Sequence, residues 1–303
     1  MRALVVGATG AVGQVVSAEL RSRGWDVTGG SRRSRSAAID LTRPSGFDAV
    51  HRLAGNHDLV VNTSGVEDVR LIQAAAPAAY LDVSATGRAL AEMRAAAAPS
   101  QRVLLGAGLV PGLSTMLIAA LPTVPGDSVD LAVILGTGEQ HGPAAVTWTA
   151  GLAGQPVFQP PEGHPVLNFR EHRMLPAERG IRRYLRADFP DHVLADPAQA
   201  ITVRSYLAVG DRATTRALGW VGRVPKLAPL LARAPHWGDD RWSLIGVNRR
   251  TGAQISARGR GQSHATGVLA ALGADALMRH ADVAVHTMAD LVPLGAVPDL
   301  SSR

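Results

Sequence analysis

The first hundred residues alternate short apolar runs with segments whose apolar residues recur at helical spacing. The apolar run 2–6 leads into a glycine-rich turn, and the residues after the turn repeat every three or four positions as far as Gly24, at Val12, Val15, Val16 and Leu20. Residues 25–30 then read as a second strand. This order of strand, glycine turn, helix and strand predicts one βαβ unit.

The same alternation continues beyond the first unit. Helices are expected at 66–76 and 87–98, and the apolar runs predict further strands at 38–41, 58–65, 79–84 and 102–108. Strands that alternate with helices indicate a parallel sheet covered on both faces. We therefore predict an α/β fold whose N-terminal part is a Rossmann-type, doubly wound parallel sheet.

The second half of the chain predicts a separate α+β domain for the substrate. A helix at 113–121 leaves the first domain after Pro111-Gly112, and a strand at 129–135 follows it. The segments 241–248 and 252–259 read as a hairpin, and 263–279 as a helix with Ser263 as its N-cap.

The glycines of the first turn stand where a dinucleotide site needs them. Gly7 permits a tight turn, Gly10 lets the backbone approach a pyrophosphate, and Gly13 lets the helix pack closely on the strand. Backbone N–H groups at the helix start attract the phosphates. The expected pyrophosphate-binding residues are Gly7, Thr9, Gly10, Ala11, Val12 and Gly13. The alternative is a purely structural turn.

The end of the second strand distinguishes the two nicotinamide cofactors. NAD sites usually place an acidic residue there for the ribose hydroxyls, whereas a 2′-phosphate favours arginine. Ser31, Arg32 and Arg33 occupy this position, and Asp26 comes too early in the strand. We therefore expect NADP(H), with Asp40 near the adenine. The alternative is a solvated basic loop.

Three later strands also end in small or polar residues. Because ligands bind at the carboxyl ends of parallel strands, these loops are expected to surround the nicotinamide. The residues assigned to the cofactor here are Asn62, Thr63, Ser64, Gly65, Ser84, Gly106, Gly108, Pro111 and Gly112.

Composition excludes several classes of protein. The chain has 303 residues, of which 46% are hydrophobic and 18% charged, as in a globular protein. It has no cysteine, which removes disulfides, thiolate metal sites and cysteine nucleophiles, and no metal site is expected. Neither a membrane-spanning run nor a secretory signal is recognisable, so a cytoplasmic protein is expected.

The net charge of +6 does not indicate a nucleic-acid partner. Of the 31 basic residues only Lys226 is a lysine, which is typical of a GC-rich bacterial genome. The arginines are mostly scattered, and aromatic residues make up only 4% of the chain, too few for a base-stacking surface. We expect a small-molecule substrate and no nucleic-acid or membrane partner.

A series of motifs resembles the saccharopine dehydrogenase-like NAD(P)-binding oxidoreductases. It comprises Gly7-x-x-Gly10-x-x-Gly13, Val60-Val61-Asn62-Thr63, Tyr80-Leu81-Asp82-Val83-Ser84, Gly106-Ala107-Gly108-Leu109-Val110-Pro111-Gly112 and Gly261-x-x-x-Ala265-Thr266. The chain departs from the family after Ser84, where a Gly-Glu pair is common. The resemblance implies reduction of a C=N bond, or oxidation of the corresponding secondary amine.

The resemblance also implies that the last helix returns to the cofactor domain. The expected division is 1–112 for NADP binding, 113–260 for substrate binding or oligomerisation, and 261–303 for C-terminal helices that pack on the first domain. A homodimer is compatible with this plan.

A rival resemblance is to the short-chain or NmrA-like reductases, which can share the same glycine turn. Short-chain dehydrogenases use a Tyr-x-x-x-Lys pair for proton transfer. Lys226 follows none of Tyr80, Tyr184 and Tyr206 by four residues, so that pair is absent. NmrA-like proteins can bind NADP without turnover, which keeps a sensor or scaffold as the alternative function.

Candidates for the proton donor are few. Tyr80 and Asp82 share a strand of the cofactor sheet, although a core role for Asp82 is favoured, and His141 follows the first strand of the second domain. The basic stretch 170–186 could clamp a carboxylate, but a solvated helix face is the preferred interpretation. The sequence thus predicts an NADP(H)-dependent oxidoreductase that acts on a C=N or C=O group in a bacterial biosynthetic pathway.

Overall fold

The computed structural model describes residues 1–138, 143–227 and 238–300, and the chain forms two compact units. The first unit comprises Met1–Leu113 and Ser263–Pro298. The second comprises Ser114–Gln262 and the chain from Asp299 onward. Helix α10 (Gln262–Arg279) therefore lies almost wholly in the first unit.

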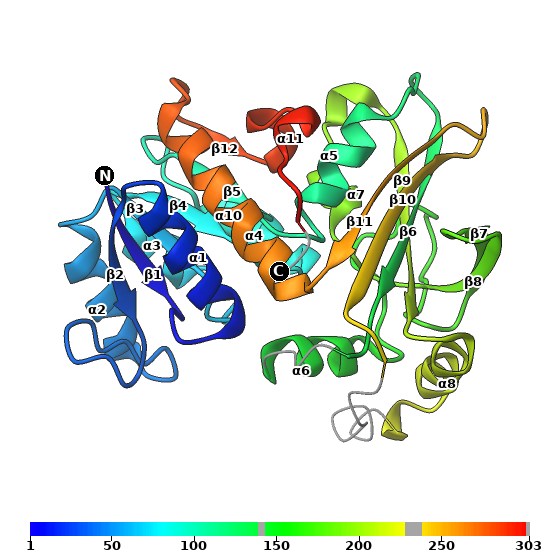
Figure 1. Cartoon of the computed structure of the whole chain (residues 1–303), viewed down its shortest axis with the longest axis horizontal. Helices are drawn as coiled ribbons and strands as arrows, with labels where there is room; N and C mark the ends of the chain where they lie inside the picture. Colours follow the sequence, from blue (N-terminus) through cyan, green and yellow to red (C-terminus); the bar gives the residue numbers. More distant parts are fainter. Residues whose placement is uncertain (139–142, 228–237, 301–303) are drawn as a thin grey trace. The chain divides into compact units, whose positions relative to one another are not determined.

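The first unit is built on a six-stranded sheet in which every pair of neighbouring strands is parallel (Figure 1). The order β12-β5-β4-β3-β1-β2 confirms the predicted Rossmann-type α/β fold. Strands β3 and β4 are buried along their whole length, as expected for central strands of a parallel sheet that is covered on both faces. The strands are β1 (Arg2–Val6), β2 (Asp26–Gly30), β3 (Leu59–Asn62), β4 (Ala79–Asp82), β5 (Val103–Leu105) and β12 (Val285–His286).

Helices cover this sheet. Helix α10 lies beside α1 in Figure 1, and a side chain at Gly267 would collide with Val15, which shows how closely the two helices pack. Right-handed connections place α1 on one face and the helices that follow β2, β3 and β4 on the other. The helices besides α10 are α1 (Ala11–Ser22), α2 (Pro44–Ala54), α3 (Arg70–Ala75), α4 (Gly87–Ala96) and α11 (Met288–Leu291).

Four local predictions need correction. Residues 38–41 form no strand beyond an isolated bridge between Ser31 and Ala38, because the chain folds back so that Ile39 covers Gly30. Helix α3 begins at Arg70 rather than 66, since side-chain hydrogen bonds hold the preceding loop. Helix α2 was not predicted. Ser263 is not an N-cap, because α10 already begins at Gln262.

The second unit holds a mixed six-stranded sheet in the order β11-β10-β6-β9-β8-β7. Only β6 and β9 are parallel, and the predicted hairpin forms as β10 and β11. Its core contains Tyr184 and Tyr206. The strands are β6 (Ser128–Leu135), β7 (His172–Pro176), β8 (Ile181–Arg186), β9 (Thr202–Val209), β10 (Arg241–Asn248) and β11 (Gln254–Arg260).

The basic stretch 170–186 is a β-hairpin and not the predicted helix face. Strands β7 and β8 pair in an antiparallel ladder, and β7 is the edge of the sheet. A turn at Gly180, which has a φ of +69°, lies between the two strands, so no helix can run through the stretch that contains the arginines. The helices of this unit are α5 (Leu113–Ala120), α6 (Pro143–Leu152), α7 (Asp191–Leu194) and α8 (Arg212–Arg223). Within the described ranges, no helix is long and apolar enough to cross a membrane.

A buried carboxyl in the second unit predicts a pH-dependent stability. Asp191 is fully buried and accepts a hydrogen bond of 2.6 Å from Ser114 Oγ, and burial raises its pKa to about 6. The folded state therefore holds this proton more tightly than the unfolded state, so stability falls as the pH rises from about 4 to about 6.

Asp191→Asn should abolish this dependence. Relative to the variant, the wild type should lose about 2.4 kcal/mol of unfolding free energy between pH 4 and pH 7, since each pKa unit corresponds to about 1.4 kcal/mol and the unfolded carboxyl is already partly ionised at pH 4. Urea unfolding of both proteins at the two pH values measures the difference. An equal pH dependence in both proteins would show that Asp191 is already ionised in the fold.

Candidate dinucleotide-binding site

The loops that follow β1 to β5 all emerge at one edge of the first sheet, because these strands are parallel. The chain runs outward from β1 to β2 on one side and to β3 on the other. This topological switch point is where open α/β sheets bind their ligands. Most residues predicted to bind the cofactor stand in these five loops.

The glycine turn after β1 is tightly constrained. Gly7 has a φ of +87°, and a Cβ there would lie 2.6 Å from the Cα of Ser64. A Cβ at Gly13 would lie 2.2 Å from the carbonyl oxygen of Gly7 and 2.7 Å from Thr63 Oγ1. Only glycine fits at these two positions.

Gly10 has a different environment. It is exposed, its φ of −75° suits any residue, and a Cβ would meet only the carbonyl oxygen of Gly7, at 3.3 Å. The space that a side chain at Gly10 would enter therefore lies outside the protein. This is the place at which the sequence motif predicts a close approach of the pyrophosphate.

The start of helix α1 is open to an anion. Gly10 is its N-cap and provides no side-chain hydrogen bond, and the first turn has no acidic residue. The backbone N–H groups of Ala11, Val12 and Gly13 are thus left for a ligand, with the positive end of the helix dipole behind them. Thr9 is exposed beside them.

The loop after β2 carries the predicted 2′-phosphate site. Its base is closed by hydrogen bonds that join Ser31 to Ala37 and Ile39. Arg32 and Arg33 are exposed, and neither forms a hydrogen bond or ion pair with the part of the chain that the structure describes. Asp26 lies at the start of β2, within 3.9 Å of Arg2, and so does not stand at the strand end.

Asp40 lies in the turn before α2. A hydrogen bond from Thr42 lowers the pKa of its carboxyl, and the positive charges of Arg43 and Arg32 act in the same direction. Asp40 therefore stays ionised near the basic loop. Because residues 38–41 form no strand, the side chain of Asp40 lies in a polar turn. A contact between Asp40 and the adenine stays a prediction.

A buried polar network supports the loops after β3 and β4. The carboxylate of Asp82, which has no exposed surface, accepts hydrogen bonds from Tyr80 Oη at 2.5 Å, Asn62 Nδ2 at 2.8 Å and the Ser84 backbone N–H at 2.7 Å. Asn62 Oδ1 in turn accepts from both the backbone N–H and the hydroxyl of Ser64. The network thereby ties the two loops together.

This arrangement favours a positioning role for Tyr80 and Asp82. Both side chains are fully buried, and burial together with the charge of Asp82 raises the pKa of Tyr80 well above its usual value. A hydroxyl of this kind is a poor proton donor to a ligand in solvent. Direct catalysis by either residue stays a prediction, and the predicted donor His141 lies outside the described residues.

Glu67 is a member of this site that the sequence prediction missed. Its Oε1 accepts hydrogen bonds from the backbone N–H groups of Ala85 and Thr86, at 3.1 and 3.2 Å. The carboxylate therefore holds the loop after β4, which contains Ser84. The available signal was an acidic residue two positions after Gly65, in a loop otherwise built of small residues.

The loop after β5 is a compact glycine turn. The N–H of Gly108 donates to the carbonyl oxygen of Pro111, and a Cβ at Gly112 would lie 2.0 Å from the carbonyl oxygen of Gly108. Gly106 has a φ of +67°. Thr266 of α10 supports the turn, because its Oγ1 accepts a hydrogen bond from the Leu109 N–H.

Residues 3–119 match the model of the NAD dependent epimerase/dehydratase family. No curated protein matches. An engineered D-amino acid dehydrogenase bound to NADP⁺ is similar over 99% of this chain and 97% of its own, with 16% identity and a TM-score of 0.49.

Two further solved structures are similar over smaller parts. Aspartate semialdehyde dehydrogenase II from Vibrio cholerae covers 82% of this chain and 74% of its own, with 12% identity and a TM-score of 0.35. A human epimerase family protein with NADPH covers 52% of this chain and 63% of its own, with 18% identity and a TM-score of 0.27.

The family match covers β1 to β5 of the first sheet, without β12, and ends in α5; it supports an NAD(P)-dependent oxidoreductase. It also supports the predicted nicotinamide dinucleotide cofactor, since the matched family is NAD dependent. The matched family is not the saccharopine dehydrogenase-like group, so that finer assignment stays a prediction.

Proposed function

We propose that the protein is an NADP(H)-dependent oxidoreductase that transfers hydride to or from a C=N or C=O carbon of a small molecule. The observation that carries the proposal is the set of groups that meet at the edge of the first sheet formed by the carboxyl ends of its strands. This edge combines a helix start at Gly10 that has no side-chain cap with two exposed arginines at the end of β2, which form no hydrogen bond or ion pair with the described residues. The helix start suits a pyrophosphate, and the arginines suit a 2′-phosphate.

Each bound group of the cofactor has residues that could hold it. The pyrophosphate would lie on the N–H groups of residues 11–13, and the 2′-phosphate on Arg32 and Arg33. The nicotinamide would lie near the loops at 62–65 and 106–112, which the network around Asp82 and the hydrogen bond from Leu109 to Thr266 hold in place. The cofactor supplies the hydride, and the protein supplies binding and orientation.

The preference for a C=N bond rests on the resemblance to the saccharopine dehydrogenase-like oxidoreductases. Its support is the motif series from Gly7 to Thr266, in which the loop at 106–112 and Thr266 lie in contact. Reduction of a carbonyl compound is the nearest alternative. A bacterial, cytoplasmic enzyme with a small-molecule substrate remains part of the proposal.

A protein that binds NADP without turnover is the second candidate. It is favoured by the burial of Tyr80 and Asp82, because these are the two predicted proton donors that the structure describes. Consumption of NADPH with a panel of imines and ketones separates the two functions. Turnover with any substrate excludes the sensor, whereas tight binding without turnover on the whole panel favours it.

Titration with NADPH and NADH tests the cofactor assignment. Arg32→Ala/Arg33→Ala should weaken NADPH binding about 10- to 100-fold and leave NADH binding unchanged, because hydrogen bonds to charged groups contribute about 1.5–3 kcal/mol and exposure places the effect toward the lower end. The matched control is Arg52→Ala, an exposed arginine of α2. Equal losses for both nucleotides, or the same loss in the control, would contradict the 2′-phosphate site.

A further inference from the structure

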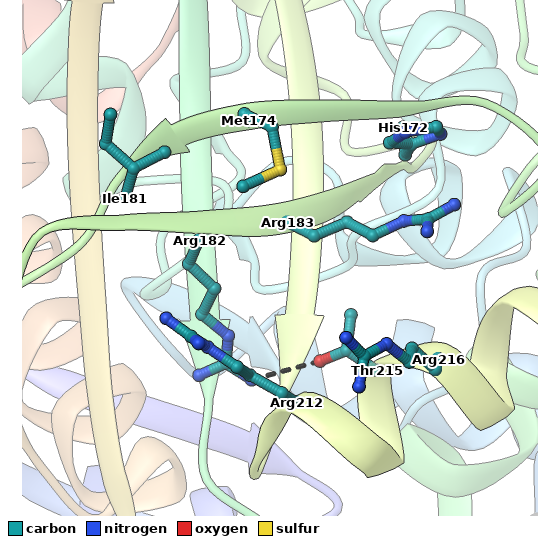
Figure 2. Close-up of a pocket in the computed structure, with 8 residues that line it drawn as sticks. All are labelled: His172, Met174, Ile181, Arg182, Arg183, Arg212, Thr215 and Arg216. Atoms are coloured by element: carbon teal, nitrogen blue, oxygen red, sulfur yellow. Dashed lines mark hydrogen bonds between the residues drawn. The ribbon is translucent and has the colours of Figure 1, made fainter.

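A basic hollow lies within the second unit, between the β7–β8 hairpin and the start of helix α8. Its volume is about 260 Å³. Figure 2 shows side chains from both elements facing it. The lining residues are His172, Met174, Ile181, Arg182, Arg183, Arg212, Thr215 and Arg216.

One of the four arginines is held by the protein itself. Arg182 Nη2 donates to the carbonyl oxygens of Val209, Gly210 and Asp211, at 3.2, 2.7 and 2.9 Å, and to Thr215 Oγ1 at 3.0 Å. Its guanidinium therefore joins β8 to the start of α8. It is a fixed positive charge at the base of the hollow.

The other three arginines form no ion pair with the described part of the chain. Within residues 1–138, 143–227 and 238–300, Arg183, Arg212 and Arg216 form no hydrogen bond or ion pair. Asp211, the acidic neighbour of Arg212, is the N-cap of α8, where it accepts from the Thr214 N–H, and its negative charge acts on Arg182. Like charges gathered without a partner repel one another, and a bound anion would relieve that repulsion.

His172 experiences the positive field of the hollow. Burial lowers the pKa of its imidazole, and the charges of Arg183 and Arg223 lower it further. The ring is therefore neutral at pH 7 and adds no charge of its own. An anion bound beside it would oppose the arginines, so the pKa of His172 can report on binding.

Apolar side chains stand directly beside the arginines. Met174 is the cross-strand partner of Arg183, and Ile181 lies two residues before Arg183 on the same face of β8. Met174 and Ile181 are 56% and 60% exposed, although they are large apolar residues. One wall of the hollow is thus apolar, and it adjoins the charged wall.

We propose that this hollow binds an amphiphile with a phosphate head group: the phosphate contacts Arg183, Arg212 and Arg216, and the apolar chain lies on Met174 and Ile181. The volume lies just below the roughly 300–1,000 Å³ that sites for larger ligands usually have, which suits a head group and the first part of a chain. The exposed apolar wall favours an amphiphile over a nucleic acid. The site involves no residue of the dinucleotide site, so it stands or falls independently of the proposed function.

Calorimetric titration with dodecyl phosphate, below the concentration at which it forms micelles, tests the site. Arg183→Ala/Arg212→Ala should weaken binding at least about tenfold, whereas Arg258→Ala, an exposed arginine of β11, should leave it unchanged. Met174→Thr should weaken the binding of dodecyl phosphate but not that of inorganic phosphate. In the wild type, NMR should show the pKa of His172 rising when dodecyl phosphate binds.

Two probes identify the source of the head group. Binding of dodecyl phosphate without retention on vesicles indicates a free amphiphile. Retention on phosphatidylcholine vesicles only when they contain phosphatidic acid, and its loss in Arg183→Ala/Arg212→Ala, indicates a lipid in a bilayer. Either result supports a phosphate amphiphile.

Three results would overturn the proposal. Dodecyl maltoside, which has the same chain and no charge, could bind as tightly as dodecyl phosphate. The Arg258→Ala control could lose as much affinity as the double variant. A single-stranded oligonucleotide could bind in a manner that depends on Arg183 and Arg212 while dodecyl phosphate does not, which would make the hollow part of a nucleic-acid surface.

Discussion

Replacement of Gly10 by alanine is expected to weaken NADPH binding about 100-fold while the protein stays folded. The backbone at Gly10 suits alanine, and the new Cβ would meet only the Gly7 carbonyl oxygen, at 3.3 Å. An alanine N-cap costs about 1 kcal/mol of stability. The same methyl group would occupy the space through which the pyrophosphate approaches the helix start, and a loss of about 3 kcal/mol in binding corresponds to about 100-fold.

Two other glycines serve as references for this measurement. Gly13→Ala should damage both folding and binding, since its Cβ would lie 2.2 Å from the Gly7 carbonyl oxygen. Gly151→Ala in α6 should leave NADPH binding unchanged and should not lower stability, because nothing lies within 4 Å of its Cβ position and alanine favours a helix more than glycine does. NADPH titration and thermal unfolding of the three variants provide the comparison. If Gly10→Ala binds NADPH like the wild type, the pyrophosphate does not lie on this turn.

Replacement of Asp82 by alanine is expected to cost at least about 3 kcal/mol of unfolding free energy. The change removes the acceptor of three buried donors, at Tyr80, Asn62 and Ser84, and each unsatisfied donor costs about 1–3 kcal/mol. A loss of this size is a large part of the stability of an ordinary domain. Urea unfolding followed by tryptophan fluorescence measures it.

Asp48→Ala, at an exposed position of α2, is the matched control and should change stability by less than about 0.5 kcal/mol. Tyr80→Phe separates a positioning role from a catalytic one. A positioning role predicts a modest loss of stability and an unchanged pH profile of turnover, whereas a catalytic proton donor predicts a large loss of kcat and an altered profile. An Asp82→Ala protein as stable as the control would show that the network does not hold the loops.

The sequence predicted the first unit well where local signals agreed. The glycine turn between 7 and 13 was identified because strand, turn and helix each have their own pattern, and together they specify one local geometry. The predicted parallel sheet is present, with β1 at the switch point. Its strands could be recognised because buried parallel strands are short, continuous apolar runs in the sequence. The hairpin of β10 and β11 was found in the same way.

The prediction failed where long-range contacts outweigh local pattern. Ile39 belongs to an apolar run, but it covers Gly30 and leaves no partner strand for residues 38–41. The arginines of 170–186 have a spacing that fits a helix, yet pairing of β8 with β9 and β7 draws them into a sheet. Glu67 was missed because its partners, the N–H groups of Ala85 and Thr86, lie 18 and 19 residues away.

The sequence by itself determined the type of fold and the glycine turn after β1, because glycines and apolar periodicity act within a few residues of one another. Only the tertiary structure decided that Tyr80 and Asp82 are buried in a common network and that Asp191 is isolated from solvent. It also decided that three arginines without an ion pair to any described residue line one hollow with Met174 and Ile181. Burial and the neighbours of a charge depend on strands and helices that are distant in the sequence. No local pattern therefore specifies them.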